Sequence, residues 1–221
     1  MFFSFFRIQL EDTAVQKMKE IKAEERGMLE VKRCDWVNTD PLYIAYHDEE
    51  WGKPLKDDLK LFELLMLEGM QAGLSWYTVL KKREGFREAF DGFDPDKIVQ
   101  YGEDKVEELM HNEGIVRNRL KIKGVITNAQ VYQQICREEE GGFSGYLWSF
   151  VGGTPVLNHW KSRAEVPATT QQSDQMSKAL KRKGMKFVGS TICYAFMQAS
   201  GMVDDHAPDC FCRTDRAVQE S

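Results

Sequence analysis

The stretch Leu67-Glu68-Gly69-Met70-Gln71-Ala72-Gly73-Leu74-Ser75-Trp76 joins two predicted helices and decides how the chain folds. The apolar run from Leu59 to Leu67 is typical of a helix buried in a core. Two glycines follow, and Ser75 is placed to cap a second helix that opens with Trp76. Glu68 is an acidic residue at the end of this core helix, where desolvation is costly. From spacing alone, a capping or ion-pairing role is favoured for it, because charges near helix ends are common.

Outward from this stretch, the chain predicts helices almost throughout. Helical patterns and caps occur at about 57–70, 76–90, 95–100, 103–111, 117–138, 146–151, 173–184 and 187–200, and around Tyr43 to His47. No segment alternates apolar and polar residues with a period of two, so we predict an all-α fold. Residues 112–116 form a glycine turn before a helix with basic first turns. This helix–hairpin–helix pattern is typical of phosphate binding, although two helices joined by a glycine turn are common.

Length and composition limit the class of protein. The 221 residues are enough for one substantial core, and the net charge of -5 gives no overall attraction for nucleic acid. No run approaches the roughly 20 apolar residues of a membrane helix, and five cysteines without framework spacing fit a reducing compartment. We therefore expect a cytoplasmic protein that does not enter membranes. We divide the chain into an N-terminal extension (1–30), one domain (31–212) and a flexible tail (213–221).

Two cysteine–histidine pairs, far apart in the sequence, suggest a metal site. Cys34 and His47 lie near the start of the domain, and His206 and Cys210 lie near its end. Four ligands of this type suit tetrahedral zinc and leave no open position, which is typical of a structural site. Cys212 is an alternative ligand to Cys210. The other interpretation, equally compatible with the spacing, is a set of free thiols and ordinary histidines.

Aromatic side chains are dense between residues 34 and 52. Trp36, Tyr43, Tyr46 and Trp51 all fall within this segment. Aromatic residues usually belong to the core, but the same density suits a pocket that stacks on a flat ligand. The sequence pattern leaves both interpretations open.

Several collinear motifs together resemble a known family. They are Cys34-Asp35-Trp36, Tyr43 to Gly52, Leu67 to Trp76, Gly114 to Arg117, Phe187 to Thr191, Tyr194 to Gln198 and Asp205-His206. The combination closely resembles the bacterial 3-methyladenine DNA glycosylases I over about residues 32–212. This resemblance implies a helix–hairpin–helix DNA glycosylase fold with a zinc site joining the N- and C-terminal parts. It implies one structural Zn²⁺ per chain, held by Cys34, His47, His206 and Cys210, and so favours Cys210 over Cys212.

The resemblance also implies the residues of a base pocket, and it reverses the interpretation of Glu68. Glu68 would recognise a flipped cationic base, with Trp36, Tyr46 and Trp76 as stacking faces and Gln71 reading a ring edge. Tyr43 and Trp51 would shape the wall, with simple core packing as an equal alternative. Leu74 would enter the space that the base leaves. We expect DNA contacts from Gly114, Arg117 and Lys121.

The implied reaction is hydrolysis of the glycosidic bond of 3-methyladenine in double-stranded DNA, with the free base as product and a monomer as the active form. The base is activated by its own charge, and the helix from Leu120 to Tyr132 contains no acidic residue. No hairpin lysine is placed for a Schiff base, because Arg119 cannot serve, so we expect monofunctional action. The alternatives are a DNA-binding module without turnover and a zinc hydrolase, which would need an open metal position.

Overall fold

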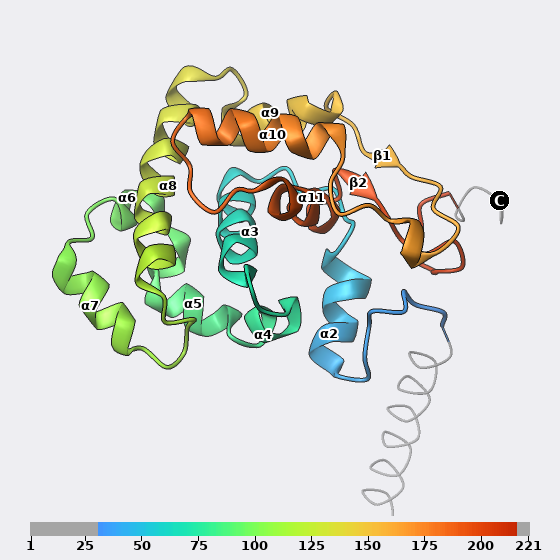
Figure 1. The fold of residues 1–221 in the computed structure, drawn as a ribbon, viewed down its shortest axis with the longest axis horizontal. Coiled ribbons are helices and arrows are strands. Elements are labelled where there is room, and N and C mark those ends of the chain that lie inside the picture. Colours follow the sequence, from blue (N-terminus) through green and yellow to red (C-terminus); the bar gives the residue numbers. More distant parts are fainter. Residues whose placement is uncertain (1–30, 216–221) are drawn as a thin grey trace, which may run out of the picture.

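The computed structural model describes residues 31–215, and they form a helical domain (Figure 1). The predicted extension at 1–30 and the end of the predicted tail, 216–221, lie outside the described residues. The elements are α2 (Pro41–Ala45), η1 (Tyr46–Glu50), α3 (Asp58–Gln71), α4 (Trp76–Lys81), α5 (Arg83–Ala89), η2 (Asp91–Phe93), α6 (Pro95–Ile98), α7 (Glu103–His111), α8 (Arg119–Glu138), α9 (Gly142–Trp148), η3 (Ser149–Val151), β1 (Val156–Leu157), η4 (Arg163–Glu165), α10 (Gln171–Arg182), α11 (Ser190–Ala199) and β2 (Val203–Asp204).

The prediction of a helical fold is confirmed, with one small addition. β1 and β2 pair in parallel over two residues each, which the sequence did not predict because two residues are too few for an alternating pattern. No helix in the described part of the chain combines the length and apolar character that a membrane crossing requires.

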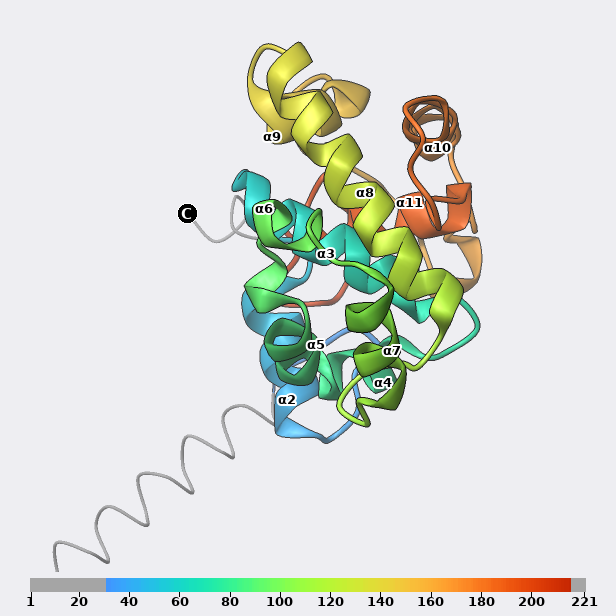
Figure 2. The same ribbon diagram turned by 90° about the vertical axis from the view of Figure 1, so that its left-hand side faces the viewer.

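Helix α3 is the centre of the domain. It contacts α4, α8, α9 and α11. Figure 1 shows it between α8 and α11, and Figure 2 shows α8 crossing in front of it. Asp57 caps it as predicted, accepting a hydrogen bond from the backbone N–H of Lys60 at 2.9 Å. Its buried residues lie between Leu61 and Met70, and every residue from Leu65 to Met70 is buried. Glu68 therefore lies in the core.

The predicted turn after α3 is also observed. Gly73 has a positive φ of 82°, a conformation that favours glycine. Ser75 then caps α4 by accepting a hydrogen bond from the N–H of Thr78 at 3.2 Å. The short connection between the two helices places Leu74 on the surface, with 43% of the residue exposed.

The single helix predicted at 76–90 is wrong. It breaks at Lys82 (φ -100°, ψ 4°) into α4 and α5. The break lets α5 pack against the turn after α7: a Cβ on Gly85 would lie 2.6 Å from the Gly114 carbonyl oxygen. The Nζ of Lys82 donates to the carbonyl of Glu113 at 2.7 Å. Tertiary packing has therefore overridden a continuous helical pattern.

Other helix starts differ from the prediction as well, and α9 begins at Gly142 rather than at Tyr146. α10 is capped by Thr170 rather than by Ser173, whose side chain instead completes a capping box. α11 begins at Ser190 rather than at Phe187, because Phe187 has a positive φ of 56° and leaves the helical conformation.

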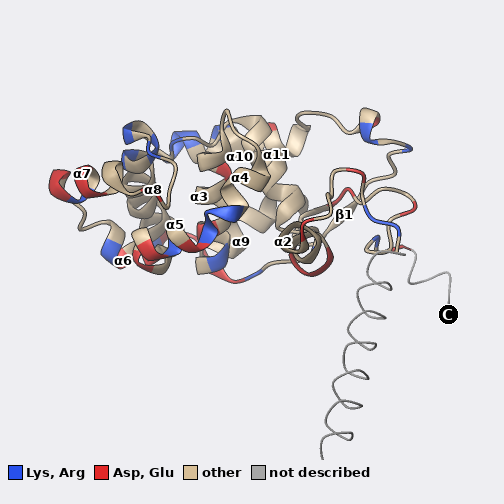
Figure 3. Cartoon of the chain, turned by 90° about the horizontal axis from the view of Figure 1, so that it is seen from below, with Lys and Arg blue, Asp and Glu red and all other residues tan. Residues whose placement is uncertain are grey.

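The segment from α7 to α8 contains the predicted glycine turn. Asn118 caps α8 and accepts from the N–H of Lys121 at 3.1 Å, so this helix begins two residues after the predicted Arg117. Two basic side chains at the start of α8 pair with acids of α7, Arg119 with Glu107 at 2.5 Å and Lys123 with Glu103 at 2.6 Å. Figure 3 shows acidic residues on α7 and basic residues on α8. Because the two sets pair, much of the charge here is neutralised within the protein.

Candidate functional site

The four predicted metal ligands come from the two ends of the domain, with Cys34 and His206 172 positions apart, and they lie together. The Sγ of Cys210 is 3.4 Å from both His47 Nε2 and His206 Nδ1, and the Sγ of Cys34 is 3.5 Å from His206 Nδ1. The four candidate ligand atoms lie within 4.8 Å of one another, and all four residues are buried. Sulfur and nitrogen ligands of one tetrahedral zinc are about 3.6 Å apart. This cluster can therefore hold a metal ion.

Polar groups around the cluster orient its members. His47 Nδ1 lies 2.7 Å from Asp48 Oδ1, which leaves Nε2 facing the thiols. Arg33 binds the same Asp48 carboxylate, and its Nη2 donates to Oδ2 at 2.7 Å. The backbone N–H of Ala207 donates to Cys34 Sγ at 3.3 Å. Cys212 lies outside the four: it interacts with Cys210 and forms a second candidate group with His47 and Asp48.

The neighbouring residues Tyr46 and His47 belong to two different sites because of the local backbone geometry. Asp40 caps α2 and Pro41 occupies its first position. The helix then widens into the π-helical turn η1, which opens with Tyr46 and His47. Both side chains are buried, but His47 joins the metal cluster while Tyr46 lines a neighbouring pocket. Wide turns of this kind are frequent at functional sites.

The pocket has a volume of about 660 Å³ and opens beside the metal cluster. Its lining includes all seven residues predicted for base binding: Trp36, Tyr43, Tyr46, Trp51, Glu68, Gln71 and Trp76. The aromatic rings support one another, with centroids 5.4 Å apart for Tyr46 and Trp76 and 5.1 Å for Trp36 and Trp51. Trp51 also meets the His206 ring edge-on at 4.6 Å, so it belongs both to the pocket wall and to the metal region.

Glu68 is the only acidic residue on the α3 side of this pocket, and only 3% of it is exposed. Burial raises its pKa to about 8. Among residues 31–215, neither its Oε2 nor the buried Nε1 of Trp76 has a hydrogen-bond partner. Burial also raises the pKa of Tyr46, and the nearby Glu68 carboxyl raises it further. Unpartnered buried polar atoms are costly, so their presence here is consistent with groups that await a ligand.

The raised pKa of Glu68 predicts a pH-dependent change in stability. Between its unfolded pKa of 4.5 and its folded pKa of about 8, the folded protein binds more protons, so folding becomes less favourable as pH rises. A Glu68→Gln variant does not titrate there. Its free energy of unfolding, relative to that of the natural protein, should be higher at pH 9 than at pH 4 by about 4 kcal/mol. Urea unfolding of both proteins at the two pH values measures this, and an equal difference at both would contradict the assignment.

The far wall of the pocket was not predicted. It includes Trp160, Arg163, Tyr194, Gln198 and Asp205. The Asp205 carboxylate binds this wall together, accepting from Trp160 Nε1 at 2.9 Å, Tyr194 Oη at 2.6 Å and Gln198 Nε2 at 2.7 Å. Asp205 directly precedes the predicted ligand His206, so its position in the sequence could have indicated that it lies near the site. Arg163 lies in the single 3-10 turn η4, and no motif or periodic pattern marks it.

The residues predicted to contact DNA have different environments. Leu74 is exposed at the tip of the turn after α3. The N–H of Gly114 already donates to Asn112 Oδ1 at 2.7 Å. Arg117 is half-exposed and 3.7 Å from Glu113. Lys121 is buried and points to the end of α3, so its ammonium is not on the surface with the others.

The fold and these sites define a helical protein with an aromatic pocket around a buried carboxylate, beside a cluster of two cysteines and two histidines. The methyladenine glycosylase family model matches residues 36–213. The chain is 52% identical over 182 residues to DNA-3-methyladenine glycosylase 1 of Escherichia coli, which covers 82% of this chain and 97% of that protein. The chain therefore belongs to the methyladenine glycosylase family.

Solved structures agree with this assignment. A crystal structure of a 3-methyladenine DNA glycosylase I is 53% identical, with a TM-score of 0.80, and covers 82% of this chain and 100% of its own. The Staphylococcus aureus 3-methyladenine DNA glycosylase I, studied for its recognition of 3-methyladenine, is 39% identical, with a TM-score of 0.79 over 82% of this chain and 96% of its own.

Proposed function

We propose that this protein is a DNA glycosylase of base-excision repair that removes 3-methyladenine from alkylated duplex DNA. The observation that carries the proposal is the desolvated Glu68, with an unpartnered oxygen, inside an aromatic pocket. Membership of the methyladenine glycosylase family supports the same substrate. Because the target base is stacked inside a duplex, the enzyme must first turn the nucleotide out of the helix.

Charge distinguishes the damaged base from adenine. Methylation at N3 gives the purine in DNA a positive charge, and a carboxylate in a dry pocket attracts a cation far more strongly than a neutral ring. The ionised form of Glu68 is disfavoured in the free protein, as its raised pKa indicates, and a bound cation restores it. Trp36, Tyr46 and Trp76 supply faces for stacking and cation–π contact, and Gln71 can read a ring edge.

Departure of the charged base requires no acid catalyst. The bond from C1′ of the sugar to the base breaks with its electron pair going to the base, which leaves as neutral 3-methyladenine. Water then adds to C1′ and loses a proton, giving an abasic sugar. α8 contains no acidic residue before Glu138, so no aspartate from its first turns faces the sugar cation. Catalysis in this proposal therefore rests on selective binding of the charged base by Glu68.

DNA would lie across the turn between α7 and α8 and the tip after α3. These two helices and their glycine turn form a helix–hairpin–helix, whose backbone suits phosphate binding. Arg117 is the basic side chain here that is least engaged within the protein, since its nearest acid, Glu113, is 3.7 Å away. Exposed Leu74 is placed to fill the gap that the turned-out base leaves.

The cluster of Cys34, His47, His206 and Cys210 would hold one structural zinc ion. The distances between its sulfur and nitrogen atoms fit a tetrahedral zinc, and four protein ligands leave no position for substrate. The ion would join residues from both ends of the domain and fix η1, which carries Tyr46 into the pocket. It takes no part in bond cleavage.

Strand cleavage tests the reaction type. We expect methylated duplex DNA incubated with the protein to acquire abasic sites, which break only after heating in alkali. Breaks without alkali would contradict monofunctional action, because they require a lyase step. No breaks even after alkali, with protein that still binds DNA, would contradict the glycosylase proposal and favour a DNA-binding module.

A further inference from the structure

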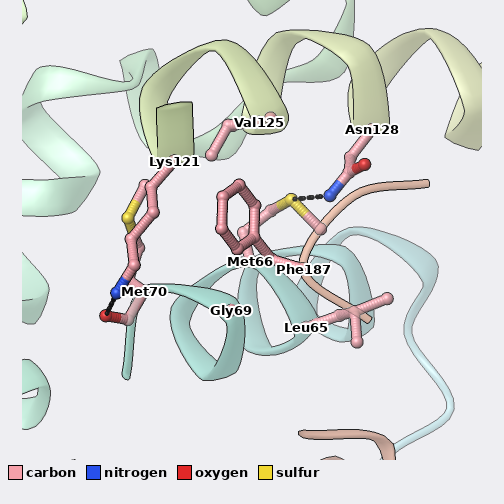
Figure 4. A pocket seen from close by; sticks show the side chains of 9 residues that line it. Leu65, Met66, Gly69, Met70, Lys121, Val125, Asn128 and Phe187 are labelled. Atoms are coloured by element: carbon pink, nitrogen blue, oxygen red, sulfur yellow. Dashed lines mark hydrogen bonds between the residues drawn. The ribbon is translucent and has the colours of Figure 1, made fainter. Parts of the chain in front are cut away.

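Lys121 is a buried ammonium that the reaction described above does not use. Only 7% of the residue is exposed, although it belongs to the first turn of α8, where its neighbours Arg119 and Lys123 reach the surface. Its Nζ donates to the carbonyl oxygen of Met70 at 2.8 Å and to that of Ala72 at 2.6 Å. Figure 4 shows the side chain crossing from α8 to the end of α3.

This placement is unfavourable for α8 by itself. A cation near a helix N-terminus is opposed by the helix dipole, and burial lowers the pKa of Lys121 by penalising its charge. No carboxylate among residues 31–215 forms an ion pair with it. The compensation comes from α3, whose last carbonyls lack helical partners and form the negative end of its dipole. The interaction therefore stabilises the end of α3 rather than the start of α8.

The two carbonyls that Lys121 binds flank part of the segment proposed for base recognition. Gln71, the last residue of α3, lies between Met70 and Ala72, and Glu68 lies less than one turn earlier. The backbone then continues to Leu74, whose N–H donates to the carbonyl of Gln71 at 2.6 Å. One ammonium thus fixes the path of the chain from the pocket carboxylate to the exposed leucine.

The position of Lys121 is itself fixed, because α8 is locked against α3. Phe187 fits between Gly69 of α3 and Gly124 of α8: a Cβ on Gly69 would lie 3.3 Å from Phe187 Cβ, and a Cβ on Gly124 would lie 2.8 Å from the ring. Figure 4 shows Phe187 between the two helices. Asn128 of α8 accepts from the N–H of Lys186 at 2.7 Å and donates to its carbonyl at 3.0 Å. α8 is therefore a rigid support, and it is also the helix that follows the DNA-binding turn.

We propose that Lys121 is a positioning residue for base excision: by binding the last carbonyls of α3, it aligns the base pocket and the Leu74 tip with the DNA held by the turn before α8. This proposal rests on the proposed glycosylase function. It replaces the prediction from sequence that Lys121 contacts a DNA phosphate. The two roles differ in measurable ways, because a phosphate contact releases counterions and a positioning contact does not.

The test compares Lys121→Met with two matched variants of the same region. For Lys121→Met we expect kcat for release of 3-methyladenine to fall by about tenfold or more, since small misplacement of a site is costly. Its affinity for undamaged duplex DNA, and the slope of log affinity against log salt concentration, should match those of the natural protein. Arg117→Met should instead reduce that slope by about one unit. Lys123→Met removes a surface charge from α8 and should leave kcat unchanged.

The outcomes separate the two proposals. If the natural protein releases no 3-methyladenine, the proposed function fails and the role of Lys121 fails with it. If the natural protein is active, an unchanged kcat in Lys121→Met or a reduced salt slope overturns the positioning role alone. Should Lys121→Met not fold, Lys121→Arg provides the same comparison. Arginine keeps the charge for a phosphate but does not fit the buried site, so lowered kcat with an unchanged salt slope remains the expected result.

Discussion

Replacing Glu68 by glutamine should leave a folded protein that releases 3-methyladenine more slowly by a factor on the order of 10² to 10³. The amide keeps the shape of the side chain but removes the negative charge that the cationic base requires. Loss of the charge also removes the titration, so the natural protein should gain kcat/KM as pH rises toward 8 and the variant should not. Single-turnover release from methylated duplex DNA measures both effects.

A second variant of α3 controls for general effects of the substitution. Glu63 lies five residues earlier and pairs with Arg87 at 2.7 Å, away from the pocket. Glu63→Gln should keep the excision rate within about twofold, because an ion pair of this kind contributes little to the fold. If Glu68→Gln excised the base as fast as Glu63→Gln, the carboxylate would have no role in recognition.

The second large effect is expected at the metal cluster. Cys210→Ser should lose the bound ion and lower the thermal midpoint by about 10 °C or more, because ligand binding to the folded state adds directly to stability. Cys212→Ser is the matched control: it changes a neighbouring thiol outside the four-residue cluster and should keep one zinc ion per chain. Metal analysis and calorimetry of the purified variants make the comparison. Loss of zinc from Cys212→Ser, with zinc retained by Cys210→Ser, would contradict the assigned ligand set.

The features that sequence reasoning predicted are those with short-range signals. Asp57 and Ser75 precede apolar helical runs, so both caps were predictable from the local sequence alone. The four candidate cysteine and histidine ligands were suggested by residue type, but their spacing left Cys212 as an alternative to Cys210, and only the family resemblance favoured Cys210. In the structure, Cys210 Sγ lies 3.4 Å from both histidines, which places it in the cluster.

The features that were missed depend on tertiary contacts. A lysine in the first turn of a basic helix is expected to be solvent-exposed. No feature of the local sequence indicates that Lys121 reaches the end of α3. The break at Lys82 is a second case, because it accompanies the close packing of α5 against Gly114, which is remote in the sequence. Trp160 and Arg163 line the pocket from a loop and from the short turn η4, where no periodic pattern indicates which side chains point inward.

The most direct test of the central claim is the identity of the bases that the natural protein releases. Purified, metal-loaded protein is incubated with methylated duplex DNA, and the released bases are separated by chromatography. A pocket built around Glu68 for a purine methylated at N3 predicts free 3-methyladenine, with 7-methylguanine left in the DNA. Folded, metal-loaded protein that releases no base at all would contradict the account.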